Sequence, residues 1–339
     1  MSSSHPRVGV VGGGIRGSMF ARAVAQHPGA TLVAMCEPAD AVRERNAHAL
    51  GVPAYADLDT MLDAHPDLTA AIIATPDFAH RDPTIRCAER GLDLLVEKPL
   101  ATSGADAEAI VTAVAAGGAR VMVGFENRWN QKFIEVRRQL TDQSGGRIVN
   151  QVADLNDTLF VPTTMLSWAA RSSPAWFLMP HSLDLTMWLS DATPTSVFAR
   201  GTKRLLPSLG VDTWDAITAS FAMSDGSIVV LNSQWVLPMT APAVFDFRYE
   251  VNTETSSFRL GISDSGVTRY DPSGVNWLQF GVYEQHGRLR GIPIDMADDF
   301  IAWSDGAELD APDASYGLLV TRAIEAVHRS LDTGQPQPL

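Results

Sequence analysis

Short apolar runs alternate with amphipathic stretches over the first 125 residues of the chain. The apolar runs have the length of strands buried on both faces, and they occupy residues 8–11, 31–36, 54–55, 70–74, 92–96 and 120–123. Between them, apolar residues recur at helical spacing over residues 18–26, 40–50, 58–64, a segment ending at 90, and 105–116. Strands that alternate with helices predict a doubly wound parallel sheet, so we expect an α/β domain over residues 1–125.

The pattern changes in the second part of the chain, where β-rich runs follow one another. They occupy residues 148–154, 196–202, 213–223, 227–236, 243–251 and 256–260, and Asp225-Gly226 indicates a hairpin turn between two of them. Two stretches with helical spacing, 174–189 and about 315–331, predict helices, and we expect the second to pack back on the first domain. This order predicts an α+β domain over residues 126–339, built on a large, mostly antiparallel open sheet.

Charge and cysteine content narrow the classes of partner. The chain has 26 Lys and Arg against 39 Asp and Glu, a net charge of −13, which disfavours nucleic acid and anionic membrane surfaces. No apolar run has membrane-spanning length and no apolar export segment precedes the first strand, so we expect a soluble, cytoplasmic protein. Cys36 and Cys87 are too far apart for a metal-binding pair, so we expect buried free thiols and no metal site.

A glycine-rich motif joins the first predicted strand to the first predicted helix. Gly12-Gly13-Gly14-Ile15-Arg16-Gly17 has the G-x-G-x-x-G spacing of a dinucleotide-binding turn. Gly12 permits the tight turn, Gly14 lets a pyrophosphate approach the backbone, and Gly17 allows close helix–strand packing. The free N–H groups at the start of the helix then bind the phosphates. The motif therefore predicts a nicotinamide dinucleotide as cofactor.

An acidic residue follows the second predicted strand at the position that reads the ribose. Glu37 lies 20 residues after Gly17, where a carboxylate accepts hydrogen bonds from the ribose hydroxyls and repels a 2′-phosphate. We therefore favour NAD over NADP. Arg43 and Arg45 on the next helix keep NADP open as the less favoured cofactor, since a nearby arginine accepts that phosphate.

A lysine follows the strand at residues 92–96, in the sequence Glu97-Lys98-Pro99. Ligands of open α/β sheets bind at the carboxyl ends of the strands, and a buried lysine there has a lowered pKa. Pro99 keeps Lys98 out of helical geometry, so the side chain is directed toward the crevice. A surface ion pair at a strand exit is the alternative for a Glu-Lys-Pro sequence taken alone.

Together, five motifs resemble the glucose–fructose oxidoreductase and inositol dehydrogenase family (Gfo/Idh/MocA). They are the glycine-rich motif, Ala74-Thr75-Pro76 with His80, Glu97-Lys98-Pro99, Val123-Gly124-Phe125 with Arg128-Trp129, and His181-x-x-Asp184. The resemblance covers most of the chain. It implies a Rossmann domain, a substrate domain with an open antiparallel sheet, and NAD(P)-dependent hydride transfer on sugars or polyols. It also implies a homodimer or homotetramer and a Lys98–Pro99 bond that is often cis.

The resemblance implies roles for named residues. Lys98 and His181 are the expected catalytic residues that handle the hydroxyl proton. The expected substrate-binding residues are Lys98, Arg128, Trp129, His181 and Asp184, although a structural ion pair is an equal interpretation of Arg128. The expected cofactor-binding residues are Gly12, Gly14, Ile15, Arg16, Gly17, Glu37, Thr75, Pro76, His80, Glu97, Lys98, Asn127 and Trp168, with a core tryptophan as the alternative for Trp168.

One position departs from the family pattern. Members usually carry an aspartate four residues before the histidine, and this chain has Phe177 there. Phenylalanine cannot hold the histidine or stabilise its charged form, so we expect His181 to be neutral at pH 7. Either one of Asp184, Asp154 and Asp157 takes the role of the missing acid, or the acid/base chemistry is altered.

Three functions follow from these residues. The first is NAD-dependent oxidation of a secondary hydroxyl on a sugar, glycoside or cyclitol, with Lys98 and His181 handling the proton. The second is redox-neutral cleavage of a glycoside, in which retained NAD oxidises the ring, a leaving group is eliminated and the ring is reduced again. The third is a sensor or co-repressor that binds dinucleotide without catalysis, which Phe177 leaves open.

Overall fold

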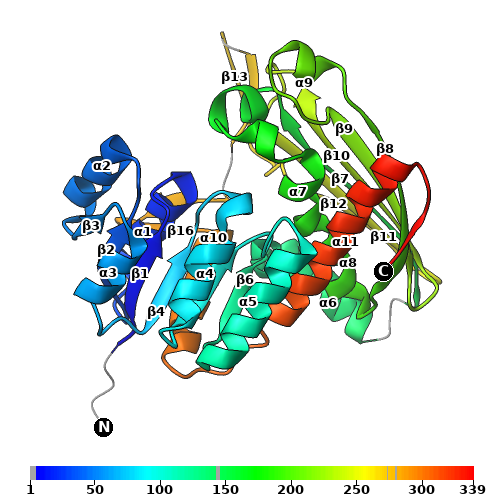
Figure 1. The fold of residues 1–339 in the computed structure, drawn as a ribbon. Coiled ribbons are helices and arrows are strands. Elements are labelled where there is room, and N and C mark those ends of the chain that lie inside the picture. The colour runs from blue at the N-terminus through cyan, green and yellow to red at the C-terminus, as the bar shows by residue number, and fades with distance from the viewer. Residues whose placement is uncertain (1–4, 143–145, 273, 279–280) are drawn as a thin grey trace. The chain divides into compact units, whose positions relative to one another are not determined.

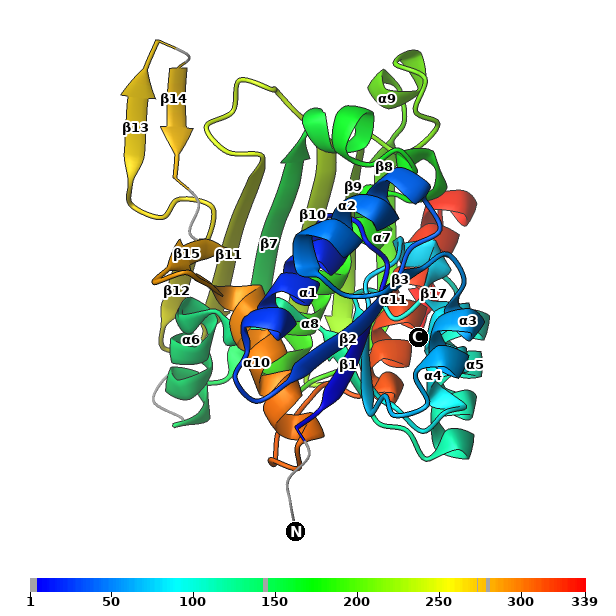
Figure 2. The same ribbon diagram turned by 90° about the vertical axis from the view of Figure 1, so that its left-hand side faces the viewer.

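The computed structural model describes residues 5–142, 146–272, 274–278 and 281–339. Contacts between residues divide the chain into two compact units, and each unit is made of two segments. The first contains Met1–Glu126 and Gly281–Thr321, and the second contains Asn127–Phe280 and Arg322–Leu339. Figures 1 and 2 label the elements in two views.

The first unit contains a six-stranded sheet in the order β3-β2-β1-β4-β5-β6. Its strands are β1 (Arg7–Val11), β2 (Thr31–Cys36), β3 (Ala54–Tyr55), β4 (Ala70–Ile73), β5 (Asp93–Glu97) and β6 (Val121–Gly124). Every neighbouring pair in this order is parallel. The predicted doubly wound parallel sheet is confirmed, and the apolar runs that predicted it are buried because both faces are covered.

Helices cover this sheet. They are α1 (Ile15–Gln26), α2 (Asp40–Leu50), α3 (Leu58–Ala64), α4 (Arg81–Ala88), α5 (Gly104–Gly117) and α10 (Ile292–Ser304). In Figure 1, α3, α4 and α5 line up beside one another, whereas α1 packs against α2 and α10. Helix α1 begins at Ile15 and not at the predicted residue 18, so the glycine-rich motif already contributes its first turn. Sequence patterning also missed α10.

The second unit contains a seven-stranded sheet in the order β12-β11-β7-β10-β9-β8-β17. Its strands are β7 (Ile148–Thr158), β8 (Pro194–Thr202), β9 (Ala216–Met223), β10 (Ile228–Leu237), β11 (Phe245–Thr253), β12 (Ser257–Gly261) and β17 (Gln337–Pro338). Neighbours are antiparallel except β7 and β10. The predicted mostly antiparallel sheet is thus confirmed. The hairpin turn at Asp225-Gly226 joins β9 to β10, with Gly226 in the left-handed region at φ 86°.

Helices α6 (Gln131–Thr141), α7 (Pro174–Phe177), α8 (Met179–Ser190) and the second part of α11 (Ala314–Thr333) belong to the second unit. The single helix predicted over residues 174–189 is wrong, because α7 and α8 are separate helices that meet at Leu178. Pro180 lies in the first turn of α8, where its missing N–H is not needed, and it cannot continue the hydrogen bonds of α7. Figure 2 also shows a separate hairpin of β13 (Thr268–Asp271) and β14 (Gly274–Trp277).

Candidate active site

The glycine-rich loop between β1 and α1 is shaped by close backbone contacts. Gly12 has φ 97°, and a Cβ atom on it would lie 2.5 Å from the carbonyl oxygen of Ala74. A Cβ atom on Gly17 would lie 1.8 Å from the carbonyl oxygen of Gly12. By contrast, no atom lies within 4 Å of a Cβ position on Gly14. The loop is therefore closed at Gly12 and Gly17, and it leaves open space at Gly14 beside the start of α1.

Glu37 directly follows β2 and holds this loop through a hydrogen bond. Its carboxylate accepts hydrogen bonds from the backbone N–H of Gly13 at 2.7 Å and of Ala39 at 2.8 Å. Asn46 of α2, which sequence patterning did not single out, donates to the carbonyl oxygen of Gly13 at 2.9 Å. An asparagine on a predicted helix gives no signal of such a contact, because it depends on how α2 packs beside the loop.

Arg43, one of the two arginines that left NADP possible as the cofactor, makes its contacts close to Glu37. Arg43 donates to the carbonyl oxygens of Glu37 and Pro38, both at 3.1 Å, and pairs with Asp40 at 2.6 Å. Its guanidinium therefore lies at the start of α2 and is partly neutralised by Asp40. Arg45 lies on the same helix and is exposed.

Arg16 binds two carboxylates that follow other strands of the sheet. Its guanidinium donates from Nε to Glu97 at 2.8 Å and from Nη2 to Glu126, and Nη2 also lies 2.7 Å from Glu97. Glu97 ends β5 and is 5% exposed, whereas Glu126 follows β6. Burial opposes the charge on Arg16, but Glu126 and Glu97 outweigh it and raise the pKa of Arg16 above its ordinary value. The predicted cofactor-binding arginine thus joins the glycine-rich loop to the ends of β5 and β6.

Lys98 directly follows β5, and its bond to Pro99 is cis, as the resemblance implies. The Lys98 backbone N–H donates to Glu97 at 3.2 Å. Burial lowers the pKa of Lys98 below its ordinary value, against the opposing effects of Glu97 and Glu126. Desolvation thus outweighs two nearby carboxylates, so a neutral amine is more accessible here than at a surface lysine.

His80 connects the loops that follow β4 and β5. Its Nδ1 lies 2.6 Å from the carbonyl oxygen of Pro99, and its Nε2 lies 3.0 Å from that of Thr75. The residue is 1% exposed, and burial lowers the pKa of its side chain. Both ring nitrogens therefore face backbone carbonyls, and the contact of His80 with a cofactor stays a prediction. Thr75 and Pro76, also predicted at the cofactor, lie in the same loop after β4.

In the second unit, α8 carries the predicted catalytic histidine. A buried network holds this helix on the sheet: Thr186 and Tyr249 share a hydrogen bond of 2.9 Å, and Tyr249 donates to Gln151 at 2.9 Å. The side-chain amide of Asn127 lies 3.3 Å from Nδ1 of His181. Because an amide nitrogen only donates, Nδ1 accepts, and the proton of the neutral ring lies on Nε2.

Arg128 and Asp184 form a buried ion pair. Arg128 donates from Nε to the two carboxylate oxygens of Asp184 at 3.0 and 3.2 Å, and from Nη2 at 2.6 Å. The guanidinium also lies 5.8 Å from the centre of the Trp188 ring. Of the two interpretations of Arg128, this geometry favours the structural ion pair. Trp129, the other predicted substrate contact in this stretch, is half-buried.

Aromatic rings surround the position where the family carries an aspartate. Phe177 packs edge-on against Trp168 at 6.0 Å and against Trp235 at 5.7 Å between ring centres. Asp157 accepts a hydrogen bond from the Trp235 indole at 3.2 Å. Asp157 is thus bound to Trp235, and Asp184 is bound to Arg128. The group observed at Nδ1 of His181 is the neutral amide of Asn127.

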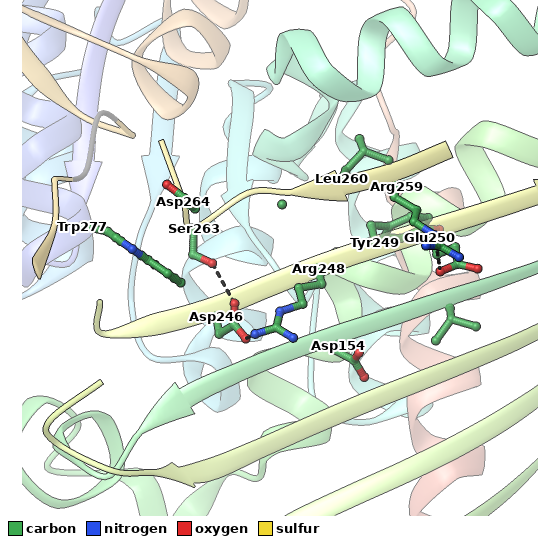
Figure 3. Close-up of a pocket in the computed structure, with 12 residues that line it drawn as sticks. Asp154, Asp246, Arg248, Tyr249, Glu250, Arg259, Leu260, Ser263, Asp264 and Trp277 are labelled. Atoms are coloured by element: carbon green, nitrogen blue, oxygen red, sulfur yellow. Dashed lines mark hydrogen bonds and ion pairs between the residues drawn. The ribbon is translucent and has the colours of Figure 1, made fainter. Parts of the chain in front are cut away.

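A hollow of about 440 Å³ lies on the face of the seven-stranded sheet opposite the helices. Arg248 and Glu250 line it and alternate along β11 with Phe247 and Tyr249, which pack against Phe133 of α6. Figure 3 shows the polar groups that line this hollow, including Asp154, Asp246, Arg248 and Asp264. The proposal that Asp154 replaces the missing acid is therefore wrong, because successive strand residues face opposite sides of a sheet.

Further expectations concern metals, thiols and membranes. Within the described ranges, His, Cys, Asp and Glu side chains do not gather in groups of three or more that could hold a metal ion. Cys36 and Cys87 are buried and free, as expected, and burial raises their pKa values to about 11 and about 12. Among the helices of the described residues, none combines the length and the apolar character needed to cross a membrane.

The predicted site residues fall into two groups. The first unit brings together the glycine-rich loop, Glu37 and the loops around His80, Arg16, Glu97 and Lys98. The second unit brings together Asn127 with His181, and Arg128 with Asp184. Lys98 belongs to the first group and His181 to the second.

Comparison with known proteins supplies the family. Residues 6–125 match the profile described as "Oxidoreductase family, NAD-binding Rossmann fold", and residues 133–259 match the GFO/IDH/MocA C-terminal domain. Inositol 2-dehydrogenase 4 of Saccharopolyspora erythraea is 28% identical over 352 residues, which cover 100% of this chain and 97% of that protein. Inositol 2-dehydrogenase of Rhodococcus jostii is 25% identical over 353 residues, which cover 99% and 93%.

Solved structures agree on the fold. The scyllo-inositol dehydrogenase of Lactobacillus casei, crystallised with NAD(H) and scyllo-inositol, superposes with a TM-score of 0.81 at 18% identity, covering 99% of both chains. With two matching family profiles that together span most of the sequence, the predicted NAD-dependent oxidoreductase is confirmed. The chain belongs to the GFO/IDH/MocA family of oxidoreductases, and its first unit is that family's NAD-binding Rossmann fold.

Proposed function

We propose that the chain oxidises a secondary hydroxyl group of a cyclitol or related sugar, with NAD as the hydride acceptor. The observation that carries this proposal is Lys98 with its lowered pKa at the carboxyl end of β5, in the NAD-binding unit of the family. Relatives that cover almost the whole chain are inositol 2-dehydrogenases, which supports a cyclitol as the substrate class.

The residues of the first unit fit an NAD molecule. Gly14 and Ile15 are exposed at the start of α1, where backbone N–H groups would bind the pyrophosphate. Glu37 would accept hydrogen bonds from the ribose hydroxyls. Each of its carboxylate oxygens already accepts a hydrogen bond from one backbone N–H and retains a second lone pair. When bound, NAD supplies the hydride acceptor.

Lys98 would accept the hydroxyl proton. Oxidation of a carbinol removes a hydride from carbon and a proton from oxygen, and a neutral amine at Nζ can take that proton. Burial lowers the pKa of Lys98 and so raises the fraction of neutral amine at a given pH. The proton then lies on Nζ and returns to solvent after the ketone is released.

His181 would share the handling of the hydroxyl as a hydrogen-bond donor. With Nδ1 accepting from Asn127, the neutral ring carries its proton on Nε2. An Nε2–H group donates to the substrate oxygen and orients one of its lone pairs. In this proposal Lys98 is the base and His181 is a hydrogen-bond donor, whereas in the family pattern an aspartate holds a histidine base. The difference is based on Asn127 at Nδ1 of His181 and on Phe177 in the position of the aspartate.

A panel of substrates tests the proposal. The purified chain, mixed with NAD and with inositols, sugars or glycosides in turn, is expected to produce absorbance of reduced nicotinamide and a ketone two mass units lighter than the substrate. Cleavage of a glycoside without net reduction of NAD would support the redox-neutral reaction in its place. No product from any of these compounds would overturn the proposal.

We also propose that the chain assembles into dimers or tetramers, as the family resemblance implies. Light scattering of the full chain is expected to give a mass two or four times that of one chain, 36.5 kDa. A mass of one chain at micromolar concentration would contradict this.

A further inference from the structure

Asn46 is the one residue of the described helix α2 that is buried, and it is polar. Its Nδ2 donates a hydrogen bond to the carbonyl oxygen of Gly13 at 2.9 Å. The Oγ of Ser18, in α1, lies 2.8 Å from the same carbonyl oxygen and 3.1 Å from Oδ1 of Asn46. Buried polar groups are stable where they are hydrogen-bonded, so these contacts account for a polar side chain at the buried position of α2.

Side chains bind both backbone polar groups of Gly13. Its N–H donates to Glu37 at 2.7 Å, and its carbonyl oxygen accepts hydrogen bonds from Asn46 and Ser18. A Cβ atom on Gly13 would lie 2.6 Å from Nδ2 of Asn46 and 3.0 Å from Cγ of Glu37. The middle position of the G-x-G sequence therefore has no room for a side chain unless Asn46 moves away.

The orientation of the Gly13 carbonyl also sets the direction of the next N–H group. The Gly13–Gly14 peptide bond is trans, and in a planar trans peptide the carbonyl and the following N–H point in opposite directions. Because the carbonyl is directed at Asn46 and Ser18, the N–H of Gly14 is directed away from them. Gly14 is exposed directly before α1, within the NAD-binding unit, so a ligand can reach this N–H.

We propose that Asn46 and Ser18 are positioning residues for the dinucleotide: by holding the Gly13 carbonyl, they direct the N–H of Gly14 toward the pyrophosphate. The inference rests on the proposed binding of the pyrophosphate at Gly14 and Ile15. It assigns an effect on phosphate binding to a residue of α2, which lies outside the G-x-G-x-x-G motif. A peptide that is already held in this orientation needs no ordering when the dinucleotide binds.

Two probes separate an effect on the pyrophosphate from a general effect on the site. ADP-ribose carries the adenosine and the pyrophosphate of NAD, whereas adenosine carries no phosphate. Calorimetry measures the affinity of the full chain for ADP-ribose and for NAD, and ligand-observed NMR measures the weaker affinity for adenosine. These measurements need no substrate and no turnover.

Asn46→Leu keeps the approximate size of the side chain and removes its donor. It is expected to weaken binding of ADP-ribose and NAD by about tenfold or more, the order of one hydrogen bond to a charged group, and binding of adenosine by less than about twofold. His48→Leu, an exposed substitution on the same helix, is the matched control and is expected to leave all three affinities unchanged. Ser18→Ala leaves Nδ2 of Asn46 in place and is expected to cause a smaller loss of ADP-ribose affinity.

An unchanged affinity for ADP-ribose in folded Asn46→Leu would overturn the inference, and so would an equal loss of affinity for adenosine. If that variant does not fold, Ser18→Ala/Asn46→Ala replaces it, because it removes both donors to the Gly13 carbonyl without adding bulk. A loss confined to ADP-ribose and NAD is expected there too, and its absence would overturn the inference equally. Such a loss in a chain that turns over none of the polyols would support the inference and refute the proposed function. Turnover of a polyol, with ADP-ribose affinity unchanged in Asn46→Leu, would do the reverse.

Discussion

The two units hold their proton-handling side chains by different means. In the first unit, Lys98 lies among charged side chains that neutralise one another, with Arg16 bound to Glu97 and Glu126. In the second unit, the neutral amide of Asn127 lies at Nδ1 of His181, and Arg128 forms an ion pair with the buried Asp184. The comparison teaches that losing one charge should change proton affinity in the first unit, whereas in the second unit it should mainly cost stability.

The largest expected effect is the loss of the proposed proton acceptor. Lys98→Ala is expected to lower kcat by about 10³–10⁴-fold, the upper part of the range for a positioned acid or base. His181→Ala is expected to lower kcat by about 10²-fold, because it removes a donor and leaves the acceptor in place. Steady-state kinetics measure both, with Lys203→Ala as an exposed control. A greater loss in His181→Ala than in Lys98→Ala would reverse the proposed division of work.

The buried ion pair of the second unit offers the next test. Arg128→Leu leaves Asp184 buried without its partner and is expected to lower the free energy of unfolding by about 3–5 kcal/mol. Arg137→Leu is the matched control, because Arg137 also lies over Trp188 but pairs with the exposed Asp191. That control is expected to cost less than about 1 kcal/mol. Denaturant unfolding measures both, and equal costs would show that the Arg128 pair is not structural.

A second histidine of the second unit gives a pH-dependent test of stability. His328 stacks on Trp176 at 5.2 Å between ring centres, and burial lowers the pKa of His328 to about 4. The unfolded chain binds this proton near pH 6.5, so the stabilisation is complete above pH 6.5 and is lost as the pH falls towards 4. The expected loss is about 3 kcal/mol. Urea unfolding across this window measures it.

Two variants isolate the contribution of His328. His328→Gln is expected to remove about 3 kcal/mol of the fall in stability between pH 6.5 and 4, because glutamine does not titrate, and to leave the part that comes from His80, whose pKa burial also lowers. His48→Gln replaces an exposed histidine and is expected to leave the fall intact. An undiminished fall in His328→Gln would show that another group is responsible.

The smallest expected effect sharpens the comparison at His181 itself. Asn127→Asp replaces the neutral amide by an anion and is expected to raise the pH at which His181 titrates by about one unit, because a nearby anion favours the charged ring. Asn127→Ala, which adds no charge, is expected to change that pH by less. NMR of the histidine ring protons across pH measures both variants. An unmoved titration of His181 in Asn127→Asp would mean that this side chain does not face His181.

Much of the fold could be predicted from local patterning, and the failures have physical causes. The strands of the first unit are apolar on both faces, so continuous apolar runs in the sequence predicted them. The glycine-rich motif predicted the turn after the first strand. Helices α6 and α10 had readable signals that were missed, since Phe133 with Val136, and Ile294 with Ala297 and Ile301, recur at helical spacing. The parallel pairing of β7 with β10 depends on the path of the chain, which no local pattern records.

The candidate site shows the same limit. Residue types and strand ends predicted Glu37 and Lys98 at one edge of the sheet, because parallel strands present their carboxyl ends together. Contacts between distant residues could not be predicted. Arg16 and Glu97 are 81 positions apart, and Asn127 and His181 are 54 apart. The sequence therefore named Arg16 and Asn127 as cofactor contacts, whereas the structure gives both of them protein partners.

Transfer of a labelled hydride tests the central claim most directly. The chain is incubated with NAD and an inositol that carries deuterium on its ring carbons, and the dinucleotide is analysed by mass spectrometry. We predict reduced nicotinamide that carries one deuterium, formed in step with the ketone and strongly diminished in Lys98→Ala. Reduced dinucleotide without deuterium, or an altered inositol beside wholly unreduced and unlabelled NAD, would contradict the proposed oxidation.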